Sequence, residues 1–279
     1  MKTKGMVVTD LDGTLFQKDR RISARNYQTL LDLGELGIIR VIATGRHLVS
    51  AHKVLSADFP IDFLIFSSGA GILAWPRQEL MFSVSMNQEE VSSAFESLSR
   101  RSLDFMVHRP IPENHHFFFF ASGRSNPDFE ARCKLYEEFA TAGQPQRVPP
   151  GKACQLVAIE PYFRTTSHYS EIREELAHLT VVRTTSPLDG RSRWIEIFSK
   201  EVSKARASMR IANDVGVHEE AVMAVGNDYN DLDLLRWAAR SFVVDDAPKE
   251  LLALFPKVNS GDESDFSEAV ALWQRETIL

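Results

Sequence analysis

Two acidic residues, spaced two positions apart, directly follow the first apolar stretch of the chain. The apolar residues are 6–8, and Asp10 and Asp12 come next, with Gly13 immediately after them. Ligands of open α/β sheets bind at the carboxyl ends of the strands, and the glycine predicts that the chain turns there. Two neighbouring carboxylates repel each other, so this arrangement suits a bound divalent cation or a shared proton. On the spacing alone, a solvated Asp-rich turn is an equally good interpretation.

Three other places in the chain carry side chains suited to an anionic ligand or a cation. Thr44 and Gly45 end a β-branched run, and Arg46 follows them. Lys204 lies in the first turn of an expected helix, where a cation opposes the helix dipole, so its position indicates a nearby anion. Residues 227–231 are rich in Asn and Asp, whose side-chain oxygens bind hard cations. Taken singly, these features are also typical of a strand-ending turn, a surface lysine and a polar loop.

Taken in chain order, these places resemble the four motifs of the haloacid dehalogenase superfamily of phosphohydrolases. The matching segments are residues 10–15, 41–46, 202–205 and 225–231. Residues 66–72 resemble the stretch that precedes the cap in the Cof-type branch, with Ser68 in place of the usual Asn. The resemblance implies an α/β fold, with a Rossmann-like parallel-sheet core and an inserted α+β cap domain of the C2 type.

The resemblance also implies how these residues act. Asp10 would attack phosphorus and form an aspartyl-phosphate, while Asp12 would protonate the leaving alcohol and then activate water. Thr44 and Lys204 would complete the catalytic set by binding phosphoryl oxygens and neutralising their charge. Relatives that transfer phosphate from ATP to water, or that displace halide, generally lack an acid at the position of Asp12. The acid therefore favours a phosphomonoester as the substrate.

The expected ligand-binding residues form two sets. Phosphate and substrate would be bound by Gly13, Thr44, Gly45, Arg46, Lys204 and Asn230. Mg²⁺ would be bound by Asp10, Asp12 (through its backbone carbonyl), Asn227, Asp228 and Asp231. For Arg46, an ion pair at the start of a helix is an equally good interpretation.

The last motif departs from the family pattern. The family usually has an acidic metal ligand at the position of Asn227, whereas here the acid, Asp228, comes one place later. An amide oxygen can bind Mg²⁺ but brings no charge, so either Asn227 is the ligand or the loop shifts to present Asp228. Asp231 would then orient the loop or reach metal-bound water. A degenerate site with weak activity is the remaining alternative.

Both ends of the chain alternate between expected strands and helices, which is typical of a parallel sheet covered on both faces. Strands are expected from the apolar runs at 6–8, 38–43, 63–66, 221–225 and 241–244. Helices are expected at 22–36, 47–55, 204–215 and 232–237, with Pro248 in the first turn of another helix and Asp265 as the N-cap of the last.

The middle of the chain has a different pattern, in which pairs of strands are interrupted by helices. Strands are expected at 81–85, 116–121, 154–159 and 180–184, and helices at 88–100, 127–142 and 169–179. This order predicts an α+β module with an antiparallel sheet. We therefore predict a core domain of residues 1–75 and 194–279 and a cap domain of residues 76–193. Arg109 and Arg191 are candidate substrate-selecting residues of the cap.

Composition limits the class of protein and its partners. The 279 residues carry a net charge of −6, which argues against a broad nucleic-acid-binding surface. No apolar stretch is long enough for a membrane span or a secretory signal, and the two cysteines lack metal-ligand spacing. We expect a cytoplasmic protein with neither a nucleic acid nor a membrane as its partner, and either a monomer or a weak homodimer.

The function that these features favour is Mg²⁺-dependent hydrolysis of a small phosphorylated metabolite. A sugar phosphate is the most frequent substrate type in such relatives. A phosphomutase would share the chemistry of Asp10 and Asp12, and a regulatory or binding protein could keep the fold without useful turnover. Magnesium-dependent hydrolysis of an aryl phosphate distinguishes an enzyme from the last of these.

Overall fold

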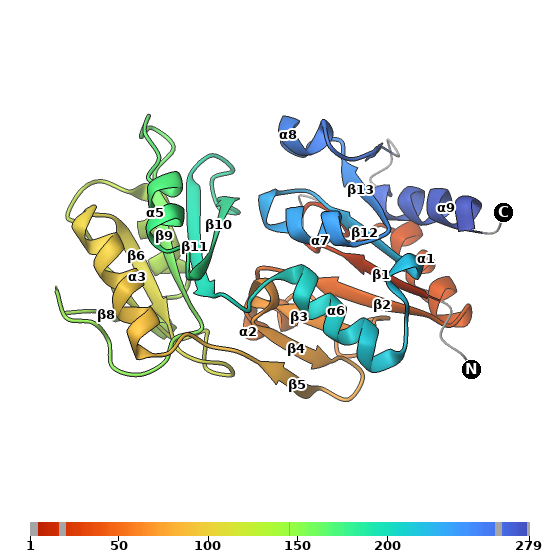
Figure 1. Ribbon diagram of the computed structural model, residues 1–279, viewed down its shortest axis with the longest axis horizontal. Coiled ribbons are helices and arrows are strands. Elements are labelled where there is room, and N and C mark those ends of the chain that lie inside the picture. Colours follow the sequence, from red (N-terminus) through yellow and green to blue (C-terminus); the bar gives the residue numbers. More distant parts are fainter. Residues whose placement is uncertain (1–4, 17–20, 145, 260–263, 278–279) are drawn as a thin grey trace. The chain divides into compact units, whose positions relative to one another are not determined.

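The chain divides into two compact units in the computed structural model. The structure describes residues 5–16, 21–144, 146–259 and 264–277. The first unit comprises residues 1–82 and 203–279, and the second comprises residues 83–202. Each unit is built around a sheet of its own, shown in Figure 1.

The sheet of the first unit has eight strands in the order β14-β13-β12-β1-β2-β3-β4-β5. The six parallel strands are β1 (Gly5–Thr9), β2 (Ile38–Ala43), β3 (Phe63–Phe66), β12 (Val222–Gly226), β13 (Arg240–Val244) and β14 (Lys257–Val258). β4 (Gly71–Ala74) runs antiparallel to β3, and β5 (Glu79–Ser83) forms the edge. Val8 of β1 is in register with Val41 and Ala224, so β1 lies at the centre of the parallel part. The loops after β1, β2 and β12 are therefore neighbours.

Helices cover this sheet. They are α1 (Ala24–Glu35), α2 (Leu48–His52), α6 (Lys204–Val215), α7 (Leu232–Trp237), α8 (Lys249–Leu252) and α9 (Asp265–Thr277). Apolar side chains of α6 and α7 form one buried cluster with Met6 and Val8 of β1. α1 and α9 lie together, joined where the Ser267 backbone N–H donates to Asn26 Oδ1 at 3.1 Å. No helix among the described residues combines the length and apolar character needed to cross a bilayer.

The sheet of the second unit has six strands in the order β10-β11-β9-β6-β7-β8. The strands are β6 (Asp104–His108), β7 (Phe117–Phe120), β8 (Ala140–Ala142), β9 (Gln155–Glu160), β10 (Leu179–Thr185) and β11 (Arg193–Ser199). All neighbours are antiparallel except β7 and β8. α3 (Gln88–Arg100) and α5 (Tyr169–Glu175) contribute to one apolar cluster, and α4 (Pro127–Leu135) contributes to a second. Odd and even residues of β6 face different clusters, as expected for a strand buried on both sides.

The predicted fold class is confirmed, whereas several element boundaries differ. The segment 81–85 was expected in the cap, but β5 is the edge strand of the first sheet. The helix expected at 127–142 ends at Leu135, because residues 140–142 pair with β7 instead. α8 and α9 begin at Lys249 and Asp265, so Pro248 and Ser264 precede their first turns, and Asp265 is not a cap. The strands β4, β6, β8, β11 and β14 were not anticipated.

The two units divide at residues 82/83 and 202/203, whereas the sequence pattern predicts division at 75/76 and 193/194. The first difference arises because β5 pairs within the first sheet. The second arises because β11 pairs with β9 and β10 in the second sheet.

Candidate active site

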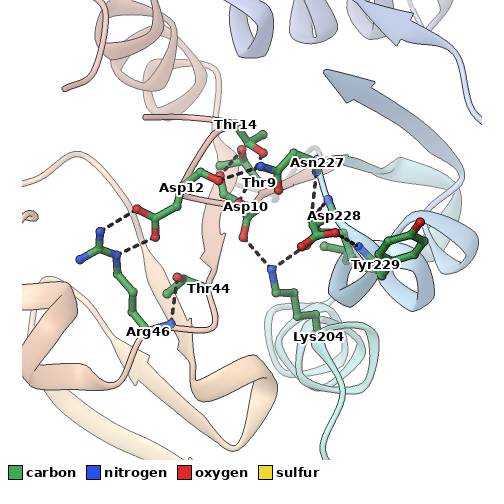
Figure 2. Close-up of polar contacts among 12 residues, drawn as sticks. Thr9, Asp10, Asp12, Thr14, Thr44, Arg46, Lys204, Asn227, Asp228 and Tyr229 are labelled. Carbon is green, nitrogen blue, oxygen red and sulfur yellow. Dashed lines mark hydrogen bonds and ion pairs between the residues drawn. The ribbon is translucent and has the colours of Figure 1, made fainter. Parts of the chain in front are cut away.

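The motif residues come together where β1, β2 and β12 end and α6 begins (Figure 2). Asp10 directly follows β1, and its backbone N–H extends the pairing with β12 by donating to Val225 O at 2.9 Å. Lys204 is the first residue of α6, and Ser203 caps that helix by accepting from Arg206 N at 3.1 Å. The carboxyl edge of a parallel sheet and a helix start thus converge on one place, as the sequence predicts.

Lys204 forms the centre of the site. Its Nζ donates to Asp10 Oδ1 and to Asp231 Oδ1, both at 2.6 Å, and the lysine is 1% exposed. A buried ammonium between two carboxylates is stable only because both partners are close. These two carboxylates are the anions that the unfavourable position of Lys204 in the helix dipole indicates.

The charges of this cluster are only partly balanced. Burial raises the pKa of Asp10 to about 7, against the attraction of Lys204, and the charge of Asp231 raises it further. Burial opposes the charge of Lys204, but attraction by Asp10 and Asp231 outweighs it and raises the pKa of the lysine. A further positive charge next to Asp10 would therefore stabilise its ionised form.

Asp12 is held by Arg46 and points away from Asp10 (Figure 2). Arg46 Nε and Nη2 donate to the two carboxylate oxygens of Asp12, each at 2.6 Å. Arg46 Nη1 is fixed in turn by Ser50, whose Oγ and backbone O lie at 3.2 and 3.3 Å. Arg46 was expected either to bind substrate or to form an ion pair, and the structure shows an ion pair with Asp12.

Gly13 gives Asn227 access to the loop after β1. Gly13 has φ +79°, and a Cβ at this position would lie 2.4 Å from Asn227 Nδ2. Asn227 Nδ2 donates to the Asp12 backbone O at 2.9 Å. The Gly13 N–H donates to Phe16 O at 2.9 Å, and phosphate binding by Gly13 stays a prediction. In this structure the glycine acts through its conformation and small size.

Asp231 and Asp228 organise the loop after β12. Asp231 Oδ2 accepts from the backbone N–H groups of Asn227 and Asp228, at 2.9 and 3.2 Å, while its Oδ1 binds Lys204. Asp228 Oδ1 accepts from Tyr229 N at 2.8 Å and caps the short 3₁₀ helix Tyr229–Asp231. Both oxygens of Asp231 are thus engaged, so the structure supports its orienting role and not metal binding. Asp228 caps this helix, and Asn227 is the residue of the loop whose side chain contacts the Asp12 backbone.

Thr44, Gly45 and Asn230 also lie at the site around Asp10. Thr44 Oγ1 accepts from Arg46 N at 3.2 Å, and the Thr44 carbonyl accepts from Ser68 N at 3.0 Å. Ser68 has φ 56°, a left-handed conformation in which Asn is favoured, which explains the Asn that the family usually has there. A Cβ added to Gly45 would lie 3.8 Å from Asn230 Nδ2, which puts Asn230 beside this loop.

Two contacts to Asp10 were not anticipated. Thr14 Oγ1 donates to Asp10 Oδ2 at 3.4 Å, and Thr9 Oγ1 donates to the Asp10 carbonyl at 2.8 Å. Thr14 belongs to the first motif, so its presence in that motif was the available signal. The cap candidates lie in the second unit, where Arg109 pairs with Glu113 at 3.4 Å and Arg191 stacks on a tyrosine ring.

The donor set at this place suits a hard cation. The Asp10 carboxylate and the Asp12 carbonyl supply oxygen atoms, which Mg²⁺ and Ca²⁺ prefer, whereas Asn227 turns its Nδ2 toward the Asp12 carbonyl and would offer Oδ1 to a cation after rotation of its amide. Within the described ranges, no group of three His, Cys, Asp or Glu side chains could hold a metal ion. A cation here would therefore depend on a backbone carbonyl and an amide as well as on Asp10.

Comparison with known proteins places this site in a family. The profile of the family described as haloacid dehalogenase-like hydrolase matches residues 7–265. The chain belongs to this family. The hydrolase is 25% identical over 257 residues to an HMP-PP phosphatase of Klebsiella pneumoniae, covering 88% of this chain and 86% of that protein. It is 23% identical over 272 residues to a 5-amino-6-(5-phospho-D-ribitylamino)uracil phosphatase of Bacillus subtilis, covering 88% and 89%.

Solved structures share the fold of the hydrolase. One is a sugar phosphatase of haloacid dehalogenase subclass IIB, with a TM-score of 0.77 at 20% identity, over 97% of this chain and 99% of that one. The predicted superfamily and its Cof-type branch are confirmed. The phosphatase names of these relatives agree with the predicted enzyme class, a phosphoric monoester hydrolase.

Proposed function

We propose that this hydrolase cleaves the phosphomonoester of a small phosphorylated metabolite, with a sugar phosphate as the first substrate to test, and that it requires Mg²⁺. The observation that carries the proposal is Lys204, buried between Asp10 and Asp231 at 2.6 Å from each. This contact holds one carboxylate at the carboxyl edge of the sheet with a cation beside it. The names of the relatives support the reaction class.

Asp10 is the nucleophile in this proposal. One carboxylate oxygen attacks phosphorus, the P–O bond to the leaving alcohol breaks, and an aspartyl-phosphate forms. Lys204 orients the carboxylate and neutralises phosphoryl charge, while Thr44 and the Gly45 N–H bind phosphoryl oxygens. Asp12 gives its proton to the leaving oxygen, then takes one from the water that attacks phosphorus, and phosphate and free Asp10 are released.

Positioning and charge stabilisation must supply most of the acceleration. Phosphate monoester hydrolysis is among the slowest uncatalysed reactions, and enzymes accelerate it by up to about 10²¹-fold. General acid–base catalysis accounts for only about 10²–10⁴ of this. Mg²⁺, held by Asp10, the Asp12 carbonyl and Asn227, supplies further charge stabilisation when bound.

In the proposal, the second unit acts as a cap that selects the substrate. Its size and α+β content fit the expected C2-type cap, and Arg109 and Arg191 stay candidates for substrate contact. The cytoplasmic location and the monomeric or weakly dimeric state are also part of the proposal.

The test is release of phosphate from a panel of phosphorylated metabolites, with and without Mg²⁺. Asp10→Asn keeps size and hydrogen bonding and should abolish turnover. The matched control is Asp245→Asn, since Asp245 also follows a core strand but pairs with Lys257 at 2.6 Å. Product that retains its phosphate, together with a need for a bisphosphate activator, would indicate a phosphomutase instead.

Asn227 favours one alternative, a weakly active regulatory member of the family. The amide brings no negative charge to the cation site. Absence of Mg²⁺-dependent turnover across the panel and with an aryl phosphate would support that alternative over the enzyme.

A further inference from the structure

A second candidate binding site lies entirely within the second unit. Three loops enclose a hollow of about 240 Å³, here called the distal hollow, whose polar lining includes Ser102, Ser122, Arg124, Ser125 and Arg164, with Phe163 among its apolar residues. The loops connect α3 to β6, β7 to α4, and β9 to α5. We propose that the distal hollow binds a phosphate group, either free or on a small metabolite.

The two arginines of the hollow differ from their neighbours. Nearby Arg101 pairs with Glu175 at 2.8 Å, and Arg193 pairs with Glu160 at 3.4 Å. Within the part of the chain that the structure describes, the guanidinium groups of Arg124 and Arg164 form neither an ion pair nor a hydrogen bond. Two guanidinium groups without carboxylate partners in one concave place are suited to an oxyanion, which they bind through paired N–H donors.

The acidic residue of the hollow does not compete for these arginines. Among the described lining residues, Asp104 carries the one carboxylate, and it is 6% exposed. Its Oδ1 accepts from Ser122 N at 2.6 Å and its Oδ2 accepts from Asn126 Nδ2 at 2.8 Å. The carboxylate is thus occupied by backbone and amide donors, and the two arginines outnumber it in charge.

The size of the hollow limits the ligand. A volume of about 240 Å³ corresponds to roughly eight waters at about 30 Å³ each. This is room for phosphate or pyrophosphate inside the hollow. Phe163 is 53% exposed and can contact an apolar part of a phosphorylated metabolite that extends outward.

The distal hollow shares no residue with the site around Asp10. It lies where β6 begins and β7 and β9 end. β11 runs antiparallel to β9, and its first residue, Arg193, lies beside Glu160, the last residue of β9. From there β11 runs away from the hollow to Ser199, and the unit ends at Val202. The proposal therefore does not rest on the proposed function.

The test is binding of inorganic phosphate, pyrophosphate and ribose 5-phosphate to the full-length chain, measured by calorimetry without divalent metal. Arg124→Ala and Arg164→Ala should each weaken binding of at least one ligand about tenfold. Arg147→Ala is the matched control, because Arg147 is exposed in the same unit and donates to Gln144 instead. The control should stay within about twofold.

Hydrogen exchange locates the ligand in the same samples. Protection at residues 120–126 and 160–165 supports the distal hollow, and tightest binding by ribose 5-phosphate identifies a metabolite and not free phosphate as its ligand. No binding up to about 10 mM, unchanged affinity in both alanine variants, or protection confined to residues 8–16 would each overturn the proposal. Arg124→Lys keeps the charge and should retain part of the affinity, which separates loss of the ligand contact from loss of folding.

Discussion

Replacement of Arg46 tests whether this residue positions Asp12 as the general acid. The guanidinium holds both carboxylate oxygens of Asp12 at 2.6 Å and is itself fixed by Ser50. When Asp12 carries the proton for the leaving oxygen on one of its oxygens, the other can still accept from Arg46, and without this support the side chain can rotate away from the leaving oxygen. Arg46→Gln should therefore slow the leaving-group step of substrates that need a proton there and spare that step for substrates that do not.

The magnitude follows from the geometry of the pair. A hydrogen bond to a charged group contributes about 1.5–3 kcal/mol. Since the Asp12 side chain is 38% exposed, the lower end applies after solvent screening. About 1.4 kcal/mol is a factor of ten in rate. We expect kcat/KM for an alkyl phosphate to fall about tenfold, within the total of about 10²–10⁴ available from general acid catalysis.

The assay compares an alkyl phosphate with 4-nitrophenyl phosphate, whose leaving group departs without protonation. The measured quantity is kcat/KM, which reports the steps up to release of the leaving group and not the later hydrolysis of the aspartyl-phosphate, which both esters share. Arg46→Gln should change kcat/KM for the aryl ester by less than about threefold, and Arg46→Lys should give an intermediate loss of kcat/KM for the alkyl ester. Arg40→Lys is the control for stability, because Arg40 makes a similar paired contact to Asp62 at 2.9 Å. Equal losses for both esters would refute the positioning role and assign Arg46 to the phosphoryl group or to the fold.

Three further predictions follow from named contacts. Asn227→Asp should lower the Mg²⁺ concentration for half-maximal activity, whereas Asp228→Asn should change it less; the reverse order in the two titrations would mean that Asp228 is the ligand. Gly13→Ala should raise the Mg²⁺ requirement, since its Cβ would displace the Asn227 amide 2.4 Å away, and an unchanged titration would contradict this. Burial and Arg132 lower the pKa of His108 to about 3, so the unfolded chain binds a proton below about pH 6.5 that the folded chain excludes. The free energy of unfolding should fall by about 1.4 kcal/mol per pH unit between roughly pH 6 and 4, and urea titrations of His108→Phe should lack this contribution.

The core and the position of Lys204 could be predicted because local signals agree with the tertiary structure there. Apart from Arg40 the run at 38–43 is apolar and mostly β-branched, as is typical of buried parallel strands, and β2 has these bounds. The helix start at Lys204 is marked by a serine cap, and the cost of a cation in the first turn indicates the anions that the structure contains.

The partners of the site side chains could not be predicted, because they depend on rotamers and on residues distant in sequence. Asp231 was expected to orient its loop or to lie at the metal, and two amides of its own loop fit the first role, but its contact with Lys204, 27 positions away, was not anticipated. Arg46 pairs with an acid 34 positions away. Spacing shows that such residues share a sheet edge but not which of them pair.

The extent of the second unit was misjudged for a different reason. β5 is exposed along most of its length although Leu80, Met81 and Phe82 are apolar, so its sequence does not indicate which sheet it joins. β11 is buried on both faces although its sequence mixes charged with apolar residues. Its buried Glu196 is accommodated because it accepts a hydrogen bond from Thr184. Strand pairing decides both assignments, and pairing is a tertiary property.

The central claim is that Asp10 becomes phosphorylated during turnover. The most direct measurement is mass spectrometry of acid-quenched Asp12→Asn protein after mixing with a substrate from the phosphate-release panel and Mg²⁺, since this variant should slow hydrolysis of the intermediate. The account predicts a peptide containing residues 6–16 that has gained one phosphoryl group on Asp10, and no such gain in Asp10→Asn. A phosphoryl group on another residue of the quenched protein, or undiminished phosphate release by Asp10→Asn, would contradict the account.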